Sequence, residues 1–231
     1  MKKKTNIIRI VLILTLVNLL VLAIRNLIVG NDFYSFLRSN LYIGSLPVIV
    51  IAYLMYHFND KLNNFIFWIG TFLWVLFYPN APYMISDLIH DSQDPAIQAN
   101  ADLIKYDTLI IFSLAMLSVF YGFLSLKLMF GLFKKRYGKH FAHIATNATI
   151  ILSCLGFYMG RELLSTLELG NGYLYSWEIF LEPIKIIKIV WNALWPVPEH
   201  WPAYAMMALF GVVQYILLIM FYYVNDIEVE V

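Results

Sequence analysis

The sequence predicts an all-α, polytopic membrane protein with about six transmembrane helices. Of its 231 residues, 61% are hydrophobic and only 13% are charged, whereas soluble domains contain roughly 45–50% apolar and about 25% charged residues. The mean hydropathy is +0.71, and a helical span needs about 17–25 mainly apolar residues. Residues 1–231 are therefore expected to form a single integral membrane domain. Six stretches meet the requirement: about 7–29, 41–58, 63–79, 108–130, 141–160 and 203–224.

The first span is expected to remain in the membrane. Lys2, Lys3 and Lys4 precede it, as basic residues precede a secretory signal. A signal core usually has about 7–15 apolar residues and ends at a small-x-small cleavage site. The run over 7–29 is longer and lacks such a site, so it is interpreted as a transmembrane helix.

The positions of lysine and arginine predict the orientation, because positively charged short loops stay in the cytoplasm. Such residues precede span one, occur between spans two and three at Lys61, and occur between spans four and five at residues 134–139. With six spans these positions share one side, so both termini are expected in the cytoplasm. The loops 30–40, 80–107 and 161–202 then face the opposite side. The near-neutral net charge of +1 argues against a nucleic-acid partner.

A polar motif follows span three. Pro79 is expected to end that span, Asn80 to cap a new helix, and Pro82 to lie in its first turn. In an α-helix over 81–90 one stripe contains Asn80, Tyr83, Asp87 and His90. Two interpretations stay open: an amphipathic helix in the membrane interface with its polar side in water, or a stripe that faces a cavity inside the bundle.

Spans four and five offer a second wall for such a cavity. Asp102, Tyr106 and Asp107 open span four, although acidic residues are also typical of helix N-termini for electrostatic reasons. Tyr158 and Arg161 end span five on the same side of the membrane as Asp87. An arginine at a span end can instead reach the lipid headgroups, so both interpretations stay open there as well.

A second amphipathic segment is expected before span six. Residues 178–195 combine apolar and polar groups and contain Trp191 and Trp195, with Trp177 and Trp201 close by. Tryptophan favours the headgroup level of a membrane. The segment is therefore interpreted as a helix that lies in the interface.

Three stretches, "FLWVLFYPNAPYMISDLIH", "YDTLIIFSLAMLSVFYGFLSL" and "GFYMGRELL…SWEIFLEP", resemble in order and spacing the bacterial family of polytopic membrane proteins catalogued as domain of unknown function 1361. The resemblance covers about 75–183. It implies a multi-pass protein of the bacterial cytoplasmic membrane, and it implies no particular activity. The matching positions are Pro79 to Tyr83, Asp87 to His90, Tyr106–Asp107, Gly160–Arg161 and Ser176–Trp177.

Three functions remain open for these residues. The first is a site on the outer side that binds or acts on a lipid-linked or envelope small molecule, with Asp87, His90 and Arg161 as catalytic groups. A divalent metal held by Asp87, His90 and Asp107 belongs to the same hypothesis. The second is a structural or partner-binding protein in which the polar cluster is an interhelical latch, for example between Asp87 and Arg161. The residues assigned to either a ligand or a latch are Asn80, Tyr83, Tyr106, Asp107, Tyr158 and Trp177.

The third function is a small-solute transporter. It ranks last because charged residues within the spans, Arg25 and Lys127, lie near span ends instead of the midplane. The sequence leaves open whether the protein is an enzyme, which ligand it binds and how many copies assemble.

Overall fold

The computed structural model describes residues 2–57, 64–91, 93–98, 100–160, 183–195 and 201–226. Its chain divides into two units, Met1–Thr149 and Ile150–Val231, with the boundary inside one helix. Six segments of the described chain are long and apolar enough to cross a membrane, which confirms the predicted all-α, six-span class. They are Arg9–Val29, Ser35–His57, Asn64–His90, Asp102–Tyr137, Lys139–Tyr158 and Trp201–Met220.

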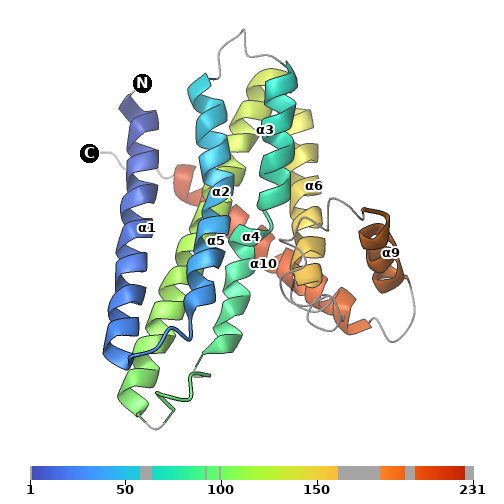
Figure 1. Ribbon diagram of the computed structural model, residues 1–231. Helices are drawn as coiled ribbons and strands as arrows, with labels where there is room; N and C mark the ends of the chain where they lie inside the picture. The colour runs from blue at the N-terminus through green and yellow to red at the C-terminus, as the bar shows by residue number, and fades with distance from the viewer. Residues whose placement is uncertain are drawn as a thin grey trace. The chain divides into compact units, whose positions relative to one another are not determined.

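The first unit is a bundle built around one long helix (Figure 1). The helix α5, Ala101–Tyr137, packs against α1, Lys2–Val29, and α2, Ser35–His57. It also packs against α4, Asn80–Tyr83, and the 3-10 helix η1, Met84–His90. The helix α3, Asn64–Phe77, packs against α2. The core between them is apolar and includes Leu22, Leu37, Leu41, Met84, Ile111 and Leu114.

Span three is broken near its middle. The span had been expected to end at residue 79, but Asn64–His90 forms one candidate span in which α3, α4 and η1 follow one another (Figure 1). The break occurs because Pro79 has no N–H to donate to the carbonyl of Val75. The expected N-cap role of Asn80 is also different, since the cap position is Pro79 and Nδ2 of Asn80 donates back to the Phe77 carbonyl at 3.2 Å.

Two glycines let the broken segment lie close to its neighbours. A Cβ atom added to Gly44 of α2 would be 2.3 Å from Oγ of Ser118. A Cβ atom added to Gly122 of α5 would be 3.2 Å from Cβ of Ala81. A side chain at position 44 would therefore require Ser118 Oγ to move, and one at position 122 would require a small shift of α4 or α5.

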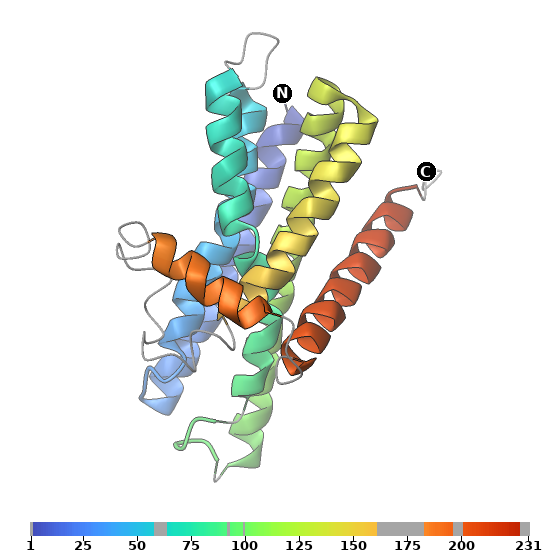
Figure 2. The ribbon, with the colours of Figure 1, turned by 90° about the vertical axis from the view of Figure 1, so that its right-hand side faces the viewer.

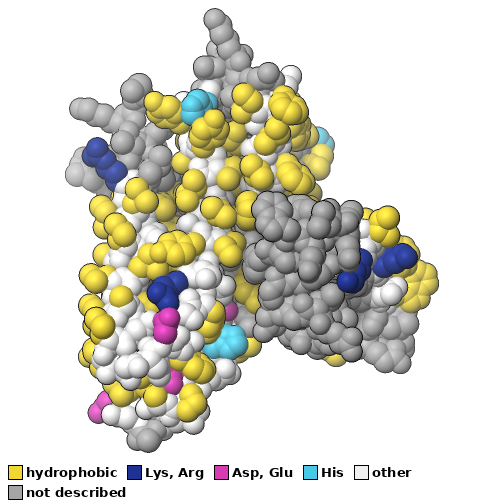
Figure 3. Space-filling view, viewed as in Figure 1, with side chains coloured by type: hydrophobic (Ala, Val, Ile, Leu, Met, Phe, Trp, Pro, Cys, Tyr) yellow, Lys and Arg dark blue, Asp and Glu magenta, His cyan; other side chains and the backbone are white. Residues whose placement is uncertain are grey.

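The two ends of the first unit differ in charge. The N-terminus of α1 lies at the same end as the short turn from α5 to α6, Lys139–Tyr158 (Figures 1 and 2). Lys134, Lys135 and Arg136 lie in the last turn of α5, and Lys139 opens α6 after Gly138, whose φ is +91°. Acidic side chains gather toward the opposite end, while apolar side chains cover much of the surface between (Figure 3).

The second unit contains the C-terminal part of α6, α9, Pro183–Leu194, and α10, Trp201–Asp226. Ser153 donates to Oε1 of Gln214 at 2.8 Å, and the rings of Phe157 and Phe210 stack with centroids 4.0 Å apart. The helix α9 falls within the segment predicted to be amphipathic, and its exposed residues include Ile184, Ile187 and Trp191 beside Lys185 and Lys188.

Candidate functional site

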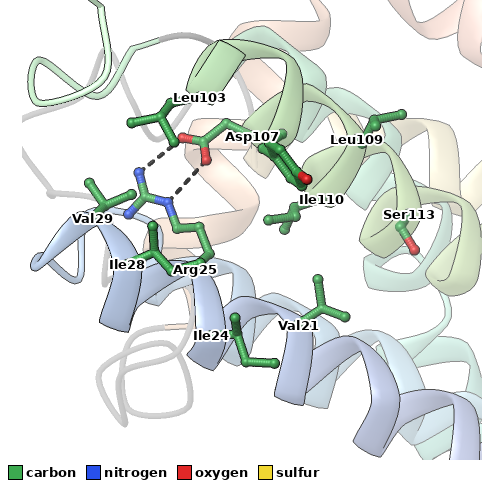
Figure 4. A pocket seen from close by; sticks show the side chains of 11 residues that line it. Val21, Ile24, Arg25, Ile28, Val29, Leu103, Asp107, Leu109, Ile110 and Ser113 are labelled. Atoms are coloured by element: carbon green, nitrogen blue, oxygen red, sulfur yellow. Dashed lines mark hydrogen bonds and ion pairs between the residues drawn. The ribbon is translucent and has the colours of Figure 1, made fainter. Parts of the chain in front are cut away.

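A buried arginine joins two aspartates at the acidic end of the first unit. Arg25 of α1, Asp94 of the chain after η1 and Asp107 of α5 are each at most 3% exposed. Nε and Nη2 of Arg25 donate to the two oxygens of Asp107 at 3.1 and 2.9 Å (Figure 4). Nη2 also donates to Asp94, and Nη1 donates to Oδ1 of Asn31 at 2.6 Å. These four residues, called the Arg25 cluster below, connect three separate segments.

Local structure brings the cluster together. Arg25 lies one turn before the end of α1, and Gly30, with φ +74°, lets the chain leave the helix in a left-handed conformation. Asn31 comes next and donates to both oxygens of Asp94, at 3.2 and 2.9 Å. Oδ1 of Asp94 also accepts from the N–H of Ala96 at 2.9 Å, which fixes the turn. Each carboxylate is thus held by donors from at least one other segment or turn.

The cluster has a formal charge of −1, because one cation lies between two carboxylates. Burial by itself would raise the pKa of Asp94, but hydrogen bonds from Arg25, Asn31 and the Ala96 N–H, together with the Arg25 charge, outweigh it and lower the pKa. An aspartate held in this way stays ionised at neutral pH. It is therefore suited to attaching segments electrostatically and not to donating a proton.

The ring of Tyr34 packs against Arg25 of the cluster. The guanidinium carbon of Arg25 lies 4.7 Å from the centroid of the Tyr34 ring, a cation–π distance. The Tyr34 hydroxyl donates to the backbone carbonyl of His90 at 3.1 Å. Burial, and after it the charge of Asp107, raises the pKa of Tyr34 to about 12. The phenol therefore stays neutral and links η1 to the start of α2.

Two more aspartates at this end have partners on other elements. Nδ2 of Asn40 in α2 donates to Oδ2 of Asp87 in η1 at 2.8 Å. Oγ1 of Thr108 in α5 donates to Asp91 at 2.8 and 2.9 Å. Carboxylates from η1 and from the residues after it are thus attached to α2, α5 and α1. Of the polar groups in this segment, Asp87 and Asp94 are buried inside the bundle, whereas His90 and Asp91 are partly exposed.

The predicted catalytic and metal-binding residues have different surroundings. Asp87 is 2% exposed. His90 is partly exposed, with Nδ1 3.1 Å from Oε1 of Gln93 and its ring centroid 5.1 Å from that of Phe36. Among the described residues no three or more His, Cys, Asp or Glu side chains form a group that could hold a metal ion. The set Asp87, His90 and Asp107 is therefore not brought together as such a group.

The 3-10 conformation of η1 changes which side chains share a face. With about three residues per turn, Met84, Asp87 and His90 come into line. The sequence prediction had assumed an α-helix, with Met84 opposite Asp87. Both residues are buried, whereas Leu88 and Ile89 are exposed, so one apolar and one acidic side chain from the same face enter the bundle.

The other predicted residues are spread more widely. Tyr83 is partly buried, and Tyr106 is 67% exposed. Tyr158 belongs to the second unit, where it packs against Ala203. Arg161 and Trp177 lie outside the described residues, so the predicted catalytic role of Arg161 and its latch with Asp87 stay predictions.

A groove is lined by residues of α1 and α5 and adjoins the cluster (Figure 4). It encloses about 630 Å³. Arg25 and Asp107 lie at one part of its wall, and Ser113 lies further along α5. The remaining lining residues are almost all apolar: Val21, Ile24, Ile28, Val29, Leu103, Tyr106, Leu109 and Ile110.

Sequence reasoning missed three members of the cluster, Arg25, Asn31 and Asp94. A signal was present, because an arginine inside an apolar span is expected to face the bundle interior and to pair with an acidic group. Its position near the span end, however, is equally typical of an arginine that reaches the lipid headgroups. The pairing of Arg25 with Asp107, 82 residues away, depends on how α1 and α5 align and has no local sequence pattern.

Comparisons with known proteins give a family and nothing further. The model of the family described as protein of unknown function (DUF1361) matches residues 39–217. No match was found among curated proteins or among solved structures.

Proposed function

Because the chain belongs to the DUF1361 family, whose description states no activity, we propose a function from the geometry: the protein binds a membrane lipid or lipid-linked small molecule. The hydrocarbon chain of this ligand lies in the groove between α1 and α5. Its polar group lies at the part of the groove wall where Arg25 and Asp107 are found.

The groove is the observation that carries this proposal. Its volume of about 630 Å³ falls within the roughly 300–1,000 Å³ typical of small-molecule sites. From Leu103 to Ser113 the axis of α5 rises about 15 Å, which is about half the thickness of a bilayer's hydrocarbon core. An apolar groove of this length, open on the membrane side, fits a hydrocarbon chain from one leaflet.

We also propose that the protein resides in a bacterial cytoplasmic membrane with both termini in the cytoplasm. The basic end of the first unit supports this orientation, because Lys134, Lys135, Arg136 and Lys139 occur there together with the start of α1. The Arg25 cluster and its end of the groove then lie toward the outer leaflet. The ligand is accordingly an outer-leaflet lipid or a lipid-linked envelope molecule.

Binding is tested with two substitutions of matched residue type and exposure. Leu109 lines the groove and is 65% exposed, whereas Leu16 lies on α1 outside the groove and is 64% exposed. Leu109→Trp fills part of the groove, so the purified protein is expected to lose its retained lipid in extraction and mass spectrometry. Leu16→Trp is the control and is expected to retain it. Equal lipid content in wild type and both variants would refute the proposal.

A second function, a structural component without a ligand, is favoured by a separate observation. The guanidinium of Arg25 makes four hydrogen bonds to three side chains on different segments, which is the arrangement of an interhelical latch. A purely structural role predicts no retained lipid in the wild type and no effect of Leu109→Trp on lipid content. The same mass-spectrometry experiment therefore separates the two functions.

An acid–base role for Asp87 and His90 is a narrower proposal. The burial of Asp87 and the partial exposure of His90 are compatible with one protected and one accessible group. Asp87→Asn keeps the shape of the side chain and removes its charge. Mass spectrometry then shows whether the bound lipid is chemically converted. Conversion by the wild type but not by this variant would support catalysis, and an unchanged lipid in both proteins would contradict it.

A further inference from the structure

We infer that the lipid held in the groove carries a positively charged headgroup, an ammonium, rather than an exposed anionic phosphate group alone. The inference rests on the proposed function, and it adds the chemical class of the ligand. It follows from the charges and hydrogen bonds at the part of the groove wall formed by Arg25 and Asp107.

The Arg25 cluster itself is negative. Arg25 contributes one positive charge, and Asp94 and Asp107 contribute two negative charges. A ligand group beside a buried, net negative cluster is favoured when its own charge is positive, because the attraction is little screened away from water. An anion at the same place would face two carboxylates.

Arg25 has little capacity left for an anion. A guanidinium has five N–H groups, and four hydrogen bonds from Arg25 already reach Asp94, Asp107 and Asn31. The bidentate pairing with Asp107 occupies the edge of the guanidinium that a phosphate would use. The arginine therefore serves the carboxylates of the cluster and is poorly placed to recognise a phosphate.

Asp107 does have acceptor capacity. Each of its oxygens accepts one described hydrogen bond from Arg25, whereas an ionised carboxylate offers about four lone-pair sites. Asp107 also lines the groove. Because Asp107 is 1% exposed, it acts on an ammonium group at this part of the wall mainly through its charge, and Arg25 stays in place.

The aromatic side chain beside it fits a cation as well. Tyr106 precedes Asp107, is 67% exposed and lines the same groove. Ammonium groups are attracted to the face of a tyrosine ring within about 6 Å of its centroid. Tyr106 and Asp107 are consecutive residues of α5 that both line the groove, and an aromatic ring and a carboxylate each favour an ammonium over a phosphate.

The wider surface at this end has the same sign. Among the described residues of the first unit here, six aspartates accompany three basic residues. They are Asp32, Asp87, Asp91, Asp94, Asp102 and Asp107 with Arg25, Arg38 and Lys105. Arg38 and Lys105 form exposed ion pairs with Asp32 and Asp102. The charges within these two pairs cancel, so the negative excess at this end comes from Asp87, Asp91, Asp94 and Asp107 with Arg25, and it favours a cationic headgroup at the groove.

The test compares two phospholipids with identical acyl chains, phosphatidylethanolamine and phosphatidylglycerol. Delipidated full-length protein is titrated with each, and bound lipid is counted by native mass spectrometry. We expect at least about fivefold tighter binding of phosphatidylethanolamine, which corresponds to about 1 kcal/mol. Removing the negative charge or the ring, in Asp107→Asn or Tyr106→Leu, is expected to bring the ratio toward one. Tyr106 is exposed, so its substitution leaves the fold intact even if Asp107→Asn does not.

Asp102→Asn is the matched control, because Asp102 lies on the same helix, is exposed and pairs only with Lys105 in a described ion pair. It is expected to keep the wild-type ratio. Equal binding of both lipids, or tighter binding of phosphatidylglycerol, overturns the headgroup inference while the groove remains a lipid site. Binding of neither lipid overturns the proposed function itself.

Discussion

The contact between Gly44 and Ser118 tests how closely α2 packs against α5 beside the broken third span. A Cβ atom on Gly44 would lie 2.3 Å from Oγ of Ser118, and its next neighbours, the Asn80 carbonyl oxygen and Met84 Sδ, would be 3.5 Å away. Gly44→Ala therefore overpacks a single contact, at a cost of about 1–3 kcal/mol. Ser118→Ala removes the obstructing atom and leaves only ordinary contacts.

A double-mutant cycle isolates this cost. Replacing glycine in a helix by alanine also stabilises the helix by up to about 1 kcal/mol, and this gain is the same with or without Ser118. The effect of Gly44→Ala on the unfolding free energy is therefore expected to be about 1–3 kcal/mol more destabilising in the protein with Ser118 than in the Ser118→Ala variant. In thermal unfolding in detergent, the change in unfolding temperature caused by Gly44→Ala should differ between the two backgrounds by about 2–4 °C for each kcal/mol.

Two single substitutions complete the experiment. Ser118 Oγ is buried and has no hydrogen-bond partner among the described atoms, so Ser118→Ala is expected to be neutral or stabilising. Gly131→Ala is the matched control in α5, because a Cβ atom there would meet nothing within 4 Å. If Gly44→Ala lowers the unfolding temperature equally in both backgrounds, or if it behaves like Gly131→Ala, the packing argument is wrong.

Two further predictions concern the charged residues. Arg25→Gln leaves two buried carboxylates without their cation and is expected to lower the unfolding free energy by about 3–5 kcal/mol. The control Arg38→Gln removes the cation of an exposed pair and should lower it by at most about 1 kcal/mol. Equal decreases in the unfolding temperature of the two variants would contradict the latch. The lowered pKa of Asp94 contributes stability above its unfolded value of about 3.9, and this stability is lost as the pH falls through the lower folded pKa. Unfolding temperatures measured from pH 7 to pH 3 should therefore fall most steeply below about pH 4, and Asp94→Asn should reduce that slope; an unchanged slope would exclude Asp94 as its source.

The sequence predicted the spans well because hydropathy reports directly on burial in lipid. Each of the six expected segments overlaps a candidate span of the structure. The predicted ends of the spans were less accurate where polar residues continue a helix beyond its apolar run. Asn100 caps α5 by accepting from the N–H groups of Asp102 and Leu103, so the helix begins before the apolar run does.

The candidate site was predicted only in part, because its pairing is set by tertiary structure. Asp87 and Asp107 were selected from the sequence, and both are buried at the acidic end. Their described partners, Asn40 and Arg25, lie 47 and 82 residues away along the chain. Such contacts depend on the alignment of helices, which local periodicity does not contain.

The two prolines within span three, Pro79 and Pro82, and the aspartates beyond them belong to one arrangement. Pro79 ends α3 at mid-span, and the chain continues as α4 and the 3-10 helix η1 toward the acidic end. The 3-10 register aligns Asp87 with Met84, so the carboxylate follows an apolar anchor into the bundle, where Asn40 binds it. An uninterrupted α-helix would turn about 300° over the three residues from Met84 to Asp87 instead of completing a full turn. The break therefore affects the position at which η1 ends. It also affects the position of the following chain, in which Asp94 binds Arg25 beside the groove.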